Sequence, residues 1–418
     1  MESLESIIVV GASLAGWRAT EGLRAEGYDG KITLVGEEPH LPYDRPPLSK
    51  QVLAGTWPPE KAVLADKKRS SELQVHEVLG HRAVGLDVAA RKVEIDDGSV
   101  LEADAIVLTT GAAPRRLPGT EALGQADGLF VLRTLEDSLA LRTAVTATEG
   151  ARVVVIGAGF IGSEVASTCS GLGCRVTVLE AMSIPLSNVL GPLVGAHCAS
   201  LHEANGVELR TAVAVEGIDT VDRATSPTSA RLSVVLAGGD TLEADVVVVG
   251  IGVVPNTGWL EGSGVELANG VVCDDRLFAA DGIVAAGDLA RWMWRHDTFE
   301  EPIRIEHWEV AANAGLAAAR SLLAGRAEAP SFQPIPYFWS DQYGIRFQVL
   351  GNPGGDDVVE IADGSLDEGK FVALYGRANR LRAVMAIGKP RQLMGFRPLL
   401  QNGVSWDDAL AHAHGVST

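Results

Sequence analysis

The chain has 418 residues, of which 46% are hydrophobic and 21% charged, and its formal net charge is −19. This length predicts more than one domain, and the acidic balance disfavours nucleic-acid binding, which requires a basic surface. No apolar run approaches the roughly 18 residues of a membrane helix. Acidic residues stand in the opening MESLES where a signal peptide would carry bases, so we expect a cytoplasmic protein without a leader.

The first part of the chain predicts a βαβ unit. Residues 7–10 form an apolar, β-branched strand, residues 11–16 a glycine turn, residues 17–26 a helix, and residues 32–35 a second strand. Units of this kind bind a dinucleotide, with its phosphates at the N-terminus of the helix.

The glycine turn of this first unit departs from the G-x-G-x-x-G pattern of dinucleotide-binding loops. Glycine stands at Gly11 and Gly16, but Ser13 occupies the second position of the pattern. Serine is small, so the loop still accommodates a pyrophosphate. Glu37 follows the second strand, where such units carry an acidic residue.

The same succession of elements returns further along the chain. Residues 152–156 predict a strand, residues 157–162 a turn, residues 163–171 a helix, and residues 175–179 the next strand. Two βαβ units in one chain predict two doubly wound domains, each able to hold a dinucleotide.

The second turn matches the full pattern and reads Gly157-Ala-Gly159-Phe160-Ile161-Gly162. Its three glycines permit in turn a tight bend, a close approach of the backbone to a pyrophosphate, and close packing of helix on strand. Glu180 ends the next strand, where a carboxylate accepts hydrogen bonds from a ribose and repels a 2′-phosphate. No arginine follows it directly to receive such a phosphate. The loop therefore predicts NADH rather than NADPH.

Three further apolar strands, over residues 105–110, 246–250 and 283–286, run into loops that contain glycine. In α/β sheets such exits place ligand-binding loops. Asp288 follows the third strand. Its carboxylate either accepts a hydrogen bond from a ribityl hydroxyl or caps the N-terminus of an ordinary helix.

A proline-rich segment covers residues 41–50 and carries Arg45 and Lys50. Its prolines exclude regular structure. The segment is either a plain connector or a stiff loop that fixes two cations near an electron-accepting ring.

The composition changes after about residue 329. Aromatic residues gather at 337–343, and the stretch 369–406 holds basic residues but no acidic ones. We expect a third, smaller α/β domain with a basic face.

The four cysteines, Cys169, Cys174, Cys198 and Cys273, form no C-x-x-C pair. Cys169 and Cys174 do not have the spacing of a dithiol redox site. Small buried hydrophobic residues in a reducing compartment are the favoured interpretation. No metal site is expected.

Taken together, these motifs resemble those of the FAD-dependent ferredoxin reductases that serve bacterial oxygenases. The resemblance rests on the first glycine loop, LPYDRPPLSK, TTGAAPR, LRTLED, IGAGFIGSEVA, GIGVVPN, AAGDLAR and FWSDQYG, in family order over nearly the whole chain. It implies an α/β fold of the glutathione-reductase type, with two Rossmann-type domains and a smaller C-terminal α/β domain. The implied divisions are an FAD domain of residues 1–114 and 248–328, an NAD domain of residues 115–247, and a C-terminal domain of residues 329–418.

The resemblance also implies roles for single residues. It places Lys50, Glu164 and Trp339 at the reacting rings, with Glu164 near the nicotinamide and paired with Lys50. The residues implied at FAD are Gly11, Ser13, Ala15, Gly16, Glu37, Arg45, Lys50, Ala83, Arg133, Asp288, His307 and Trp308. Those implied or predicted at NADH are Gly157, Gly159, Phe160, Ile161, Gly162, Glu180 and Gly252.

The implied activity is hydride transfer from NADH to FAD, followed by single-electron transfer to an iron–sulfur ferredoxin that serves an oxygenase. Disulfide reductases of the wider family need cysteines that are absent before residue 169. One hypothesis for ferredoxin docking uses Arg377, Arg380, Arg382, Lys389, Arg391 and Arg397, which equally fit an ordinary solvated face.

Two other functions stay open on the residues alone: an NADH oxidase or peroxidase in which the flavin meets oxygen, and a signalling flavoprotein like the apoptosis-inducing relatives. The oligomeric state is open between a monomer and a weak homodimer.

Overall fold

The structure is a computed structural model that describes residues 4–221, 231–296 and 299–415. The chain forms two compact units, each built from several separate segments. The first comprises Met1–Asp44, Ala62–Ala113 and Val254–Tyr337, and the second comprises Arg45–Lys61, Pro114–Val253 and Phe338–Thr418.

A six-stranded sheet forms the centre of the first unit. Its order is β19 (Phe278–Ala280), β20 (Ile283–Ala285), β7 (Ala105–Leu108), β1 (Ser6–Val10), β2 (Lys31–Gly36) and β3 (Val75–Leu79), and all pairs except β19–β20 are parallel. The central strands are apolar on both faces, as expected for parallel strands that are covered on both sides.

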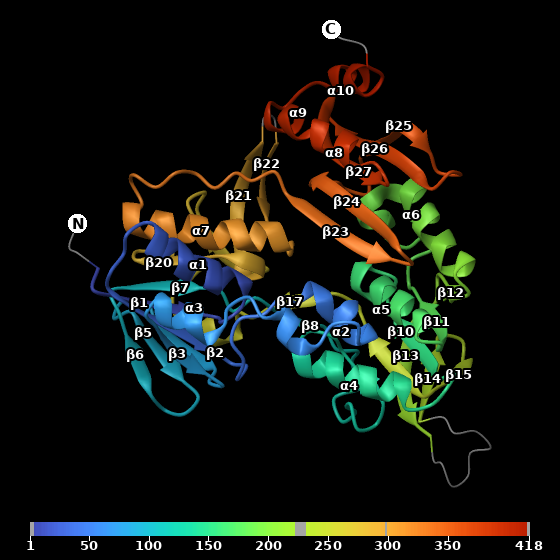
Figure 1. Cartoon of the computed structure of the whole chain (residues 1–418), viewed down its shortest axis with the longest axis horizontal. Coiled ribbons are helices and arrows are strands. Elements are labelled where there is room, and N and C mark those ends of the chain that lie inside the picture. The colour runs from blue at the N-terminus through green and yellow to red at the C-terminus, as the bar shows by residue number, and fades with distance from the viewer. Residues whose placement is uncertain (1–3, 222–230, 297–298, 416–418) are drawn as a thin grey trace. The chain divides into compact units, whose positions relative to one another are not determined.

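Two long helices of the first unit, α1 (Leu14–Ala25) and α7 (Trp308–Ala324), lie side by side (Figure 1). Glycine permits their close approach, because a Cβ atom on Gly315 would lie 2.3 Å from the carbonyl oxygen of Ala15. The order β3-β2-β1-β7-β20 brings the carboxyl ends of β1 and β7 together where the strand order reverses, which is where such sheets bind ligands.

Smaller elements complete the first unit. Two three-stranded sheets pair β4 (Ala83–Asp87) with β5 (Lys92–Ile95) and β6 (Val100–Glu102), and β18 (Val271–Cys273) with β21 (Ala290–His296) and β22 (Phe299–Ile303). This unit also holds the helix α3 (Lys67–Glu72) and the 3₁₀ turns η3 (Gly258–Leu260) and η4 (Gly287–Leu289). A further 3₁₀ turn, η2 (Pro59–Ala62), ends at the residue where the chain returns from the second unit to the first. The short strands β8 (Ala112–Pro114) and β17 (Val253–Pro255) stand where the chain passes from one unit to the other.

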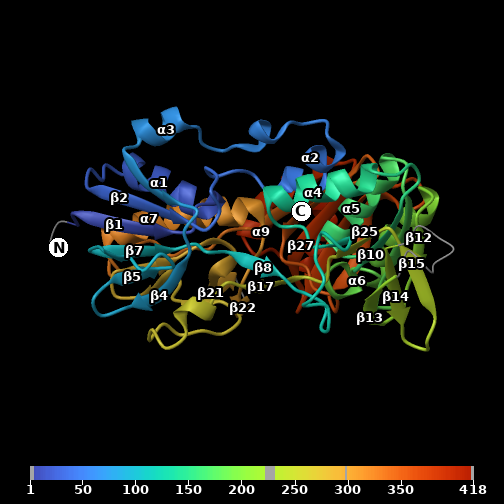
Figure 2. The same ribbon diagram turned by 90° about the horizontal axis from the view of Figure 1, so that it is seen from below.

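The second unit has its own parallel sheet. Its order is β12 (Glu208–Arg210), β11 (Arg175–Leu179), β10 (Arg152–Ile156), β16 (Val246–Val249) and β9 (Leu129–Phe130). The helices α4 (Leu135–Thr146) and α5 (Phe160–Gly171) lie on one side, and the meander β13 (Val215–Thr220), β14 (Leu232–Leu236) and β15 (Thr241–Ala244) packs on the other (Figure 2). The two predicted doubly wound folds are therefore confirmed.

An antiparallel sheet from the C-terminal part of the chain belongs to the second unit. Its order is β23 (Tyr337–Gln342), β24 (Ile345–Gly351), β27 (Arg380–Ile387), β26 (Lys370–Arg377) and β25 (Val358–Ser365). It packs on α6 (Ser187–Ala204) through a shared core, in which Tyr375 donates a hydrogen bond of 3.1 Å to the carbonyl of Leu190. The last helices are α8 (Pro390–Gly395), α9 (Arg397–Gln401) and α10 (Trp406–Ala413).

Two expectations about local structure were wrong in detail. The proline-rich segment is not irregular, because it forms the 3₁₀ turn η1 (Pro46–Ser49) and the short helix α2 (Gln51–Ala54). Proline fits the first turn of a helix, where its missing N–H would be unsatisfied anyway. Both βαβ helices also begin inside the glycine turns, at Leu14 and Phe160, so that the third glycine of each pattern belongs to the first helical turn.

The basic stretch of the C-terminal sheet is not a free basic face. The Arg382 side chain is buried, and Arg377 and Lys389 form ion pairs of 2.7 and 2.9 Å with Asp357 and Asp363. Asp357 and Asp363 precede the acid-free stretch 369–406 in the sequence, and only the fold brings them beside its basic side chains. The docking hypothesis is therefore wrong for Arg382. Two other residues of the proposed docking set, Arg377 and Lys389, are paired with acidic residues of the same protein. The expected three-domain division stays a prediction.

In the part of the chain that the structure describes, no helix has both the length and the apolar character that crossing a membrane requires.

Candidate active site

The first glycine loop turns sharply at the carboxyl end of β1. Gly11 has φ +121°, and its N–H donates to the carbonyl of Val35 at 2.8 Å. A Cβ atom at Gly11 would lie 2.2 Å from the carbonyl oxygen of Thr109, at the end of β7. Only glycine fits both the backbone conformation and the contact.

The helix that follows this loop starts close against it. A Cβ atom at Gly16 would lie 2.0 Å from the carbonyl oxygen of Gly11. Ser13 is the extended N-cap residue, and its hydroxyl makes no capping hydrogen bond. The N–H groups of the first helical turn lack intrahelical partners, so this end of α1 is suited to bind a phosphate.

The second glycine loop repeats this geometry in the other unit. Gly157 has φ +102°, and a Cβ atom there would lie 2.4 Å from the carbonyl oxygen of Gly250, at the end of β16. A Cβ atom at Gly162 would lie 2.1 Å from the carbonyl oxygen of Gly157. Each unit thus has a glycine loop at the point where its strand order reverses.

Gly159 is the informative exception among these glycines. Its φ is −72°, which any residue adopts, and no atom lies within 4 Å of a Cβ built there. The protein itself therefore does not require glycine at this position. A ligand that approaches the backbone closely does, which fits a pyrophosphate, and Ser13 occupies the equivalent position of the first loop.

Glu180 is fixed at the mouth of the second loop. Its two carboxylate oxygens accept hydrogen bonds from the N–H groups of Ala158 and Met182, each at 2.8 Å. Each oxygen keeps a further lone pair, so the carboxylate can still accept a ribose hydroxyl. Glu37, its counterpart after β2, is 66% exposed and lies 3.7 Å from Arg82.

The other residues implied at FAD in the first unit lie in η4, at the start of β4 and at the start of α7. Asp288 is in η4, whose Gly287 lies against Ala15 at the start of α1, where a Cβ on Gly287 would be 2.8 Å from that of Ala15. Ala83 begins β4. This loop after β20 therefore joins the first glycine loop at one edge of the sheet.

His307 and Trp308 begin α7. The indole N–H of Trp308 donates to Asp44 at 2.7 Å, and burial raises the pKa of Asp44. Burial lowers the pKa of His307 to about 4, so its imidazole is neutral at physiological pH.

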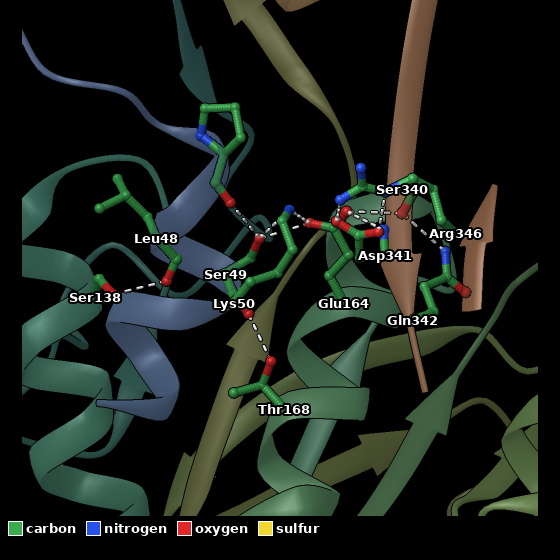
Figure 3. A network of polar contacts seen from close by, with 11 residues as sticks. Leu48, Ser49, Lys50, Ser138, Glu164, Thr168, Ser340, Asp341, Gln342 and Arg346 are labelled. Atoms are coloured by element: carbon green, nitrogen blue, oxygen red, sulfur yellow. Dashed lines mark hydrogen bonds and ion pairs between the residues drawn. The ribbon is translucent and has the colours of Figure 1, made fainter. Parts of the chain in front are cut away.

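The second unit holds a buried ion pair between Lys50 and Glu164 (Figure 3). The Nζ atom of Lys50 lies 2.6 Å from Oε2 of Glu164, and the two side chains are 12% and 7% exposed. Ser49 donates to the same oxygen at 2.5 Å. Oε1 accepts hydrogen bonds of 2.7 Å from the Ser340 hydroxyl and 3.3 Å from the N–H of Asp341. The predicted pairing of Lys50 with Glu164 is confirmed.

Neighbouring helices hold the segment that carries Lys50. Thr168 of α5 donates to the carbonyl of Ser49, and Ser138 of α4 donates to that of Leu48, each at 2.7 Å (Figure 3). Lys50 itself joins η1 to α2 with φ −122° and ψ −99°. The cation is therefore fixed by its backbone as well as by its carboxylate partner.

The sequence reasoning missed Ser49 and Ser340 as partners of Glu164. Ser49 lies inside the motif LPYDRPPLSK and Ser340 inside FWSDQYG, so these two motifs already indicated the segments that contain them. It also missed a second network behind the glycine loop. There Ser163 Oγ lies 3.3 Å from His202 Nε2, and the Tyr343 hydroxyl lies 2.8 Å from His202 Nδ1.

This second network ties three elements together. The N–H of Tyr343 donates to Ser167 of α5 at 2.7 Å, while His202 comes from α6. Burial lowers the pKa of His202 to about 4 and raises that of Tyr343. The neutral imidazole of His202 and the neutral phenol of Tyr343 therefore help to hold the inward face of α5 in place.

The remaining residues predicted in the second unit make local contacts of their own. Arg45 donates to the carbonyl of Arg133 at 2.5 Å, and Gly252 accepts from the N–H of Arg115 at 2.9 Å. Trp339 precedes Ser340 on β23. Phe160 contacts Phe338 edge to face at 4.8 Å, whereas the Ile161 side chain is 48% exposed.

Comparisons with protein families match two models to the chain. The model for "Pyridine nucleotide-disulphide oxidoreductase" matches residues 5–315, and the model for "Reductase C-terminal" matches residues 337–417.

Similar proteins cover nearly the whole chain. Rhodocoxin reductase of Rhodococcus erythropolis is 34% identical over 94% of this chain and 89% of its own length. The ferredoxin–NAD(+) reductase component of the biphenyl dioxygenase system of Paraburkholderia xenovorans is 34% identical over 96% of this chain and 94% of its own. The crystal structure of the covalent putidaredoxin reductase–putidaredoxin complex matches with a TM-score of 0.89 and 30% identity, over 98% of both chains.

Proposed function

Because the chain belongs to the pyridine nucleotide-disulphide oxidoreductase family, and within it to the ferredoxin reductases of oxygenase systems, we propose that it reduces an iron–sulfur ferredoxin with electrons from NADH. The ferredoxin in turn serves a monooxygenase or a dioxygenase. The proposal includes FAD and NADH as cofactor and substrate, which enzymes of this family use.

The observation that carries this proposal is the repeated glycine loop. Gly11 and Gly157 each turn with positive φ against the carbonyl at the end of a neighbouring strand, and a helix N-terminus follows each. Two dinucleotides, one for each unit, fit these two loops. When bound, the flavin of FAD takes a hydride from NADH and releases the electrons one at a time, which is the chemistry that the cofactor supplies.

We assign the nucleotide site of the second unit to NADH. The open space at Gly159 admits the pyrophosphate, and Glu180 accepts the ribose hydroxyls. A 2′-phosphate beside this carboxylate would be repelled, and the following N–H of Met182 is already bound to it. Phe160, Ile161, Gly162 and Gly252 are proposed to complete this site.

Lys50 and Glu164 are proposed to act by position and charge at the nicotinamide side of the reaction. Glu164 accepts from Ser49, Lys50 and Ser340, which holds its carboxylate in one position, from which it orients a carboxamide. Lys50 holds a fixed positive charge that favours an anionic reduced ring. Trp339 is proposed as the neighbouring aromatic contact.

The FAD assignments of the first unit rest on its glycine loop and on the motifs. The proposed FAD residues there are Gly11, Ser13, Ala15, Gly16, Glu37, Ala83, Asp288, His307 and Trp308, and those of the second unit are Arg45, Lys50 and Arg133. A cytoplasmic location is also proposed, because the described cysteines are all free thiols.

A steady-state assay tests the function. Oxidation of NADH should depend on added two-iron ferredoxin from an oxygenase system and should reduce that ferredoxin. Consumption of NADH that is equally fast with oxygen alone would overturn the proposal in favour of an oxidase.

A further inference from the structure

The C-terminal end of α5 brings two cysteines together. The N–H of Cys174 donates to the carbonyl of Cys169 at 3.1 Å, and the N–H of Gly173 donates to that of Ser170 at 2.9 Å. Gly173 has φ +85°. This pair of bonds around a left-handed glycine is the Schellman motif, in which the first and last residues pack their side chains against each other.

The spacing of Cys169 and Cys174 therefore has a different meaning from the one that the sequence suggested. Five positions apart along an extended chain, two thiols would lie far from each other. Across this helix end, a hydrogen bond of 3.1 Å joins their main chains, and the Schellman geometry brings the two side chains against each other, as a disulfide requires. The sequence predicted small buried hydrophobic side chains; the structure has both residues as free thiols, and it adds that they meet at one helix end.

The two thiols also differ in their surroundings. Cys169 is fully buried, whereas Cys174 is partly exposed and its thiol lies 3.5 Å from the carbonyl of Val145. A hydrogen bond from the Cys169 thiol lowers the pKa of Cys174, while the same hydrogen bond, together with burial, raises the pKa of Cys169 well above its usual range. Cys174 is thus the accessible nucleophile, and Cys169 is the partner beside it.

We propose that Cys169 and Cys174 form a reversible disulfide when the protein meets hydrogen peroxide. The Cys174 thiolate attacks one peroxide oxygen, which gives a sulfenic acid and releases hydroxide, and hydroxide takes up a proton to become water. The Cys169 sulfur then attacks the Cys174 sulfur, the S–S bond forms, and the sulfenic oxygen leaves as water with the Cys169 proton. Two thiols lose two electrons, and one peroxide becomes two water molecules.

The bond would join the last turn of α5 to the residue that precedes β11. The same helix carries Glu164, and β11 leads to Glu180. The modification site belongs to the proposed nucleotide-binding unit, but its chemistry does not depend on the proposed electron transfer. Failure of either proposal can therefore be told apart.

Peroxide treatment of the holoprotein followed by tryptic peptide mass spectrometry tests this site, because trypsin separates this pair of cysteines from the other two. Cys169 and Cys174 fall in one peptide of residues 153–175, Cys198 in residues 176–210, and Cys273 in residues 232–276. After graded peroxide treatment, alkylation and digestion, we expect the first peptide to resist alkylation and to be lighter by two hydrogen atoms. Dithiothreitol should restore both alkylation sites.

The other two cysteines are internal controls. Burial raises the pKa of Cys198 and of Cys273 to about 12. Both thiols should therefore escape oxidation by peroxide, and both should react with the alkylating reagent only after the protein is unfolded. Cys174→Ser should abolish the bridge and leave Cys169 reduced, whereas Cys198→Ala should leave the bridge intact. Sulfinic acid on Cys174 without a bridge, or two reduced thiols in peptide 153–175 of the native protein, would overturn the proposal.

Discussion

Glu164 accepts hydrogen bonds on both carboxylate oxygens, from Lys50 and Ser49 on one and from Ser340 on the other, at 2.6, 2.5 and 2.7 Å. One acid on α5 thus links a segment near the start of the chain to a strand near its end. With donors on each of its oxygens, the carboxylate has little freedom to move.

Removal of the donor from Ser340 tests this arrangement. Hydrogen bonds to charged groups contribute about 1.5–3 kcal/mol, so Ser340→Ala should lower kcat/KM for NADH by at least about tenfold. The measurement is the rate of NADH-dependent reduction of a small dye. Ser405→Ala is a matched control, because Ser405 caps α10 by accepting from Asp408 at 3.1 Å. It should lose stability, by about 1 kcal/mol, and keep full activity.

The contrast between Gly159 and Gly157 gives a second prediction. A methyl group at Gly159 meets no protein atom, so Gly159→Ala should keep the unfolding temperature and raise KM for NADH by about tenfold, because it enters the space for the pyrophosphate. Gly157→Ala meets the Gly250 carbonyl and a φ of +102°, so it should destabilise the protein by more than about 1 kcal/mol. An unchanged KM in Gly159→Ala would contradict the position of the pyrophosphate.

The buried His202 predicts how stability depends on pH. Burial lowers its pKa from 6.5 to about 4 in the folded protein, so the unfolded chain binds a proton that the folded one does not between these values. Its stabilising contribution is fully present above about pH 6.5 and is lost as pH falls through 4, by about 3 kcal/mol in all. Urea unfolding across this range measures it.

Substitution separates this effect from other titrating groups. His202→Asn should reduce stability at pH 7 and flatten its fall between pH 6.5 and 4. His414→Asn, at an exposed position on the last described turn, should leave the fall unchanged. Equal slopes in His202→Asn and the unaltered protein would show that His202 is protonated in the folded state.

Ferredoxin docking can be tested at the exposed Arg391 of α8. Arg391→Glu should raise KM for an acidic ferredoxin several-fold and leave dye reduction unchanged, since a rim charge acts mainly on association. Arg116→Glu is a charge-matched control on another exposed loop. A fall in both activities of Arg391→Glu would mean that the residue supports the fold rather than docking.

The sequence allowed prediction of whatever is encoded locally. The two βαβ units, their glycine loops and the strand that ends at Glu180 follow from short patterns of apolar residues and glycine. Strands over residues 152–156 and 175–179 have the predicted bounds, because buried parallel strands show unbroken β-branched runs.

Contacts between distant segments were beyond such patterns. Ser340 and Glu164 are 176 positions apart, and Tyr343 and His202 are 141 apart, so nothing local marks either pair. The contact of Cys169 with Cys174 is local, but it depends on a helix that ends at Gly171 with Gly173 in the left-handed region. The pairing of Arg377 and Lys389 escaped prediction for a related reason, since Asp357 and Asp363 reach them only through the fold of the sheet.

Anaerobic titration of the purified, FAD-loaded protein tests the central claim most directly. One equivalent of NADH should bleach the flavin absorbance fully, and NADPH should act far more slowly, because Glu180 stands where the 2′-phosphate would lie. Glu180→Gln should narrow that difference. Equal rates with both nucleotides in the unaltered protein would contradict the assignment of Glu180, and a protein that binds no flavin would contradict the account as a whole.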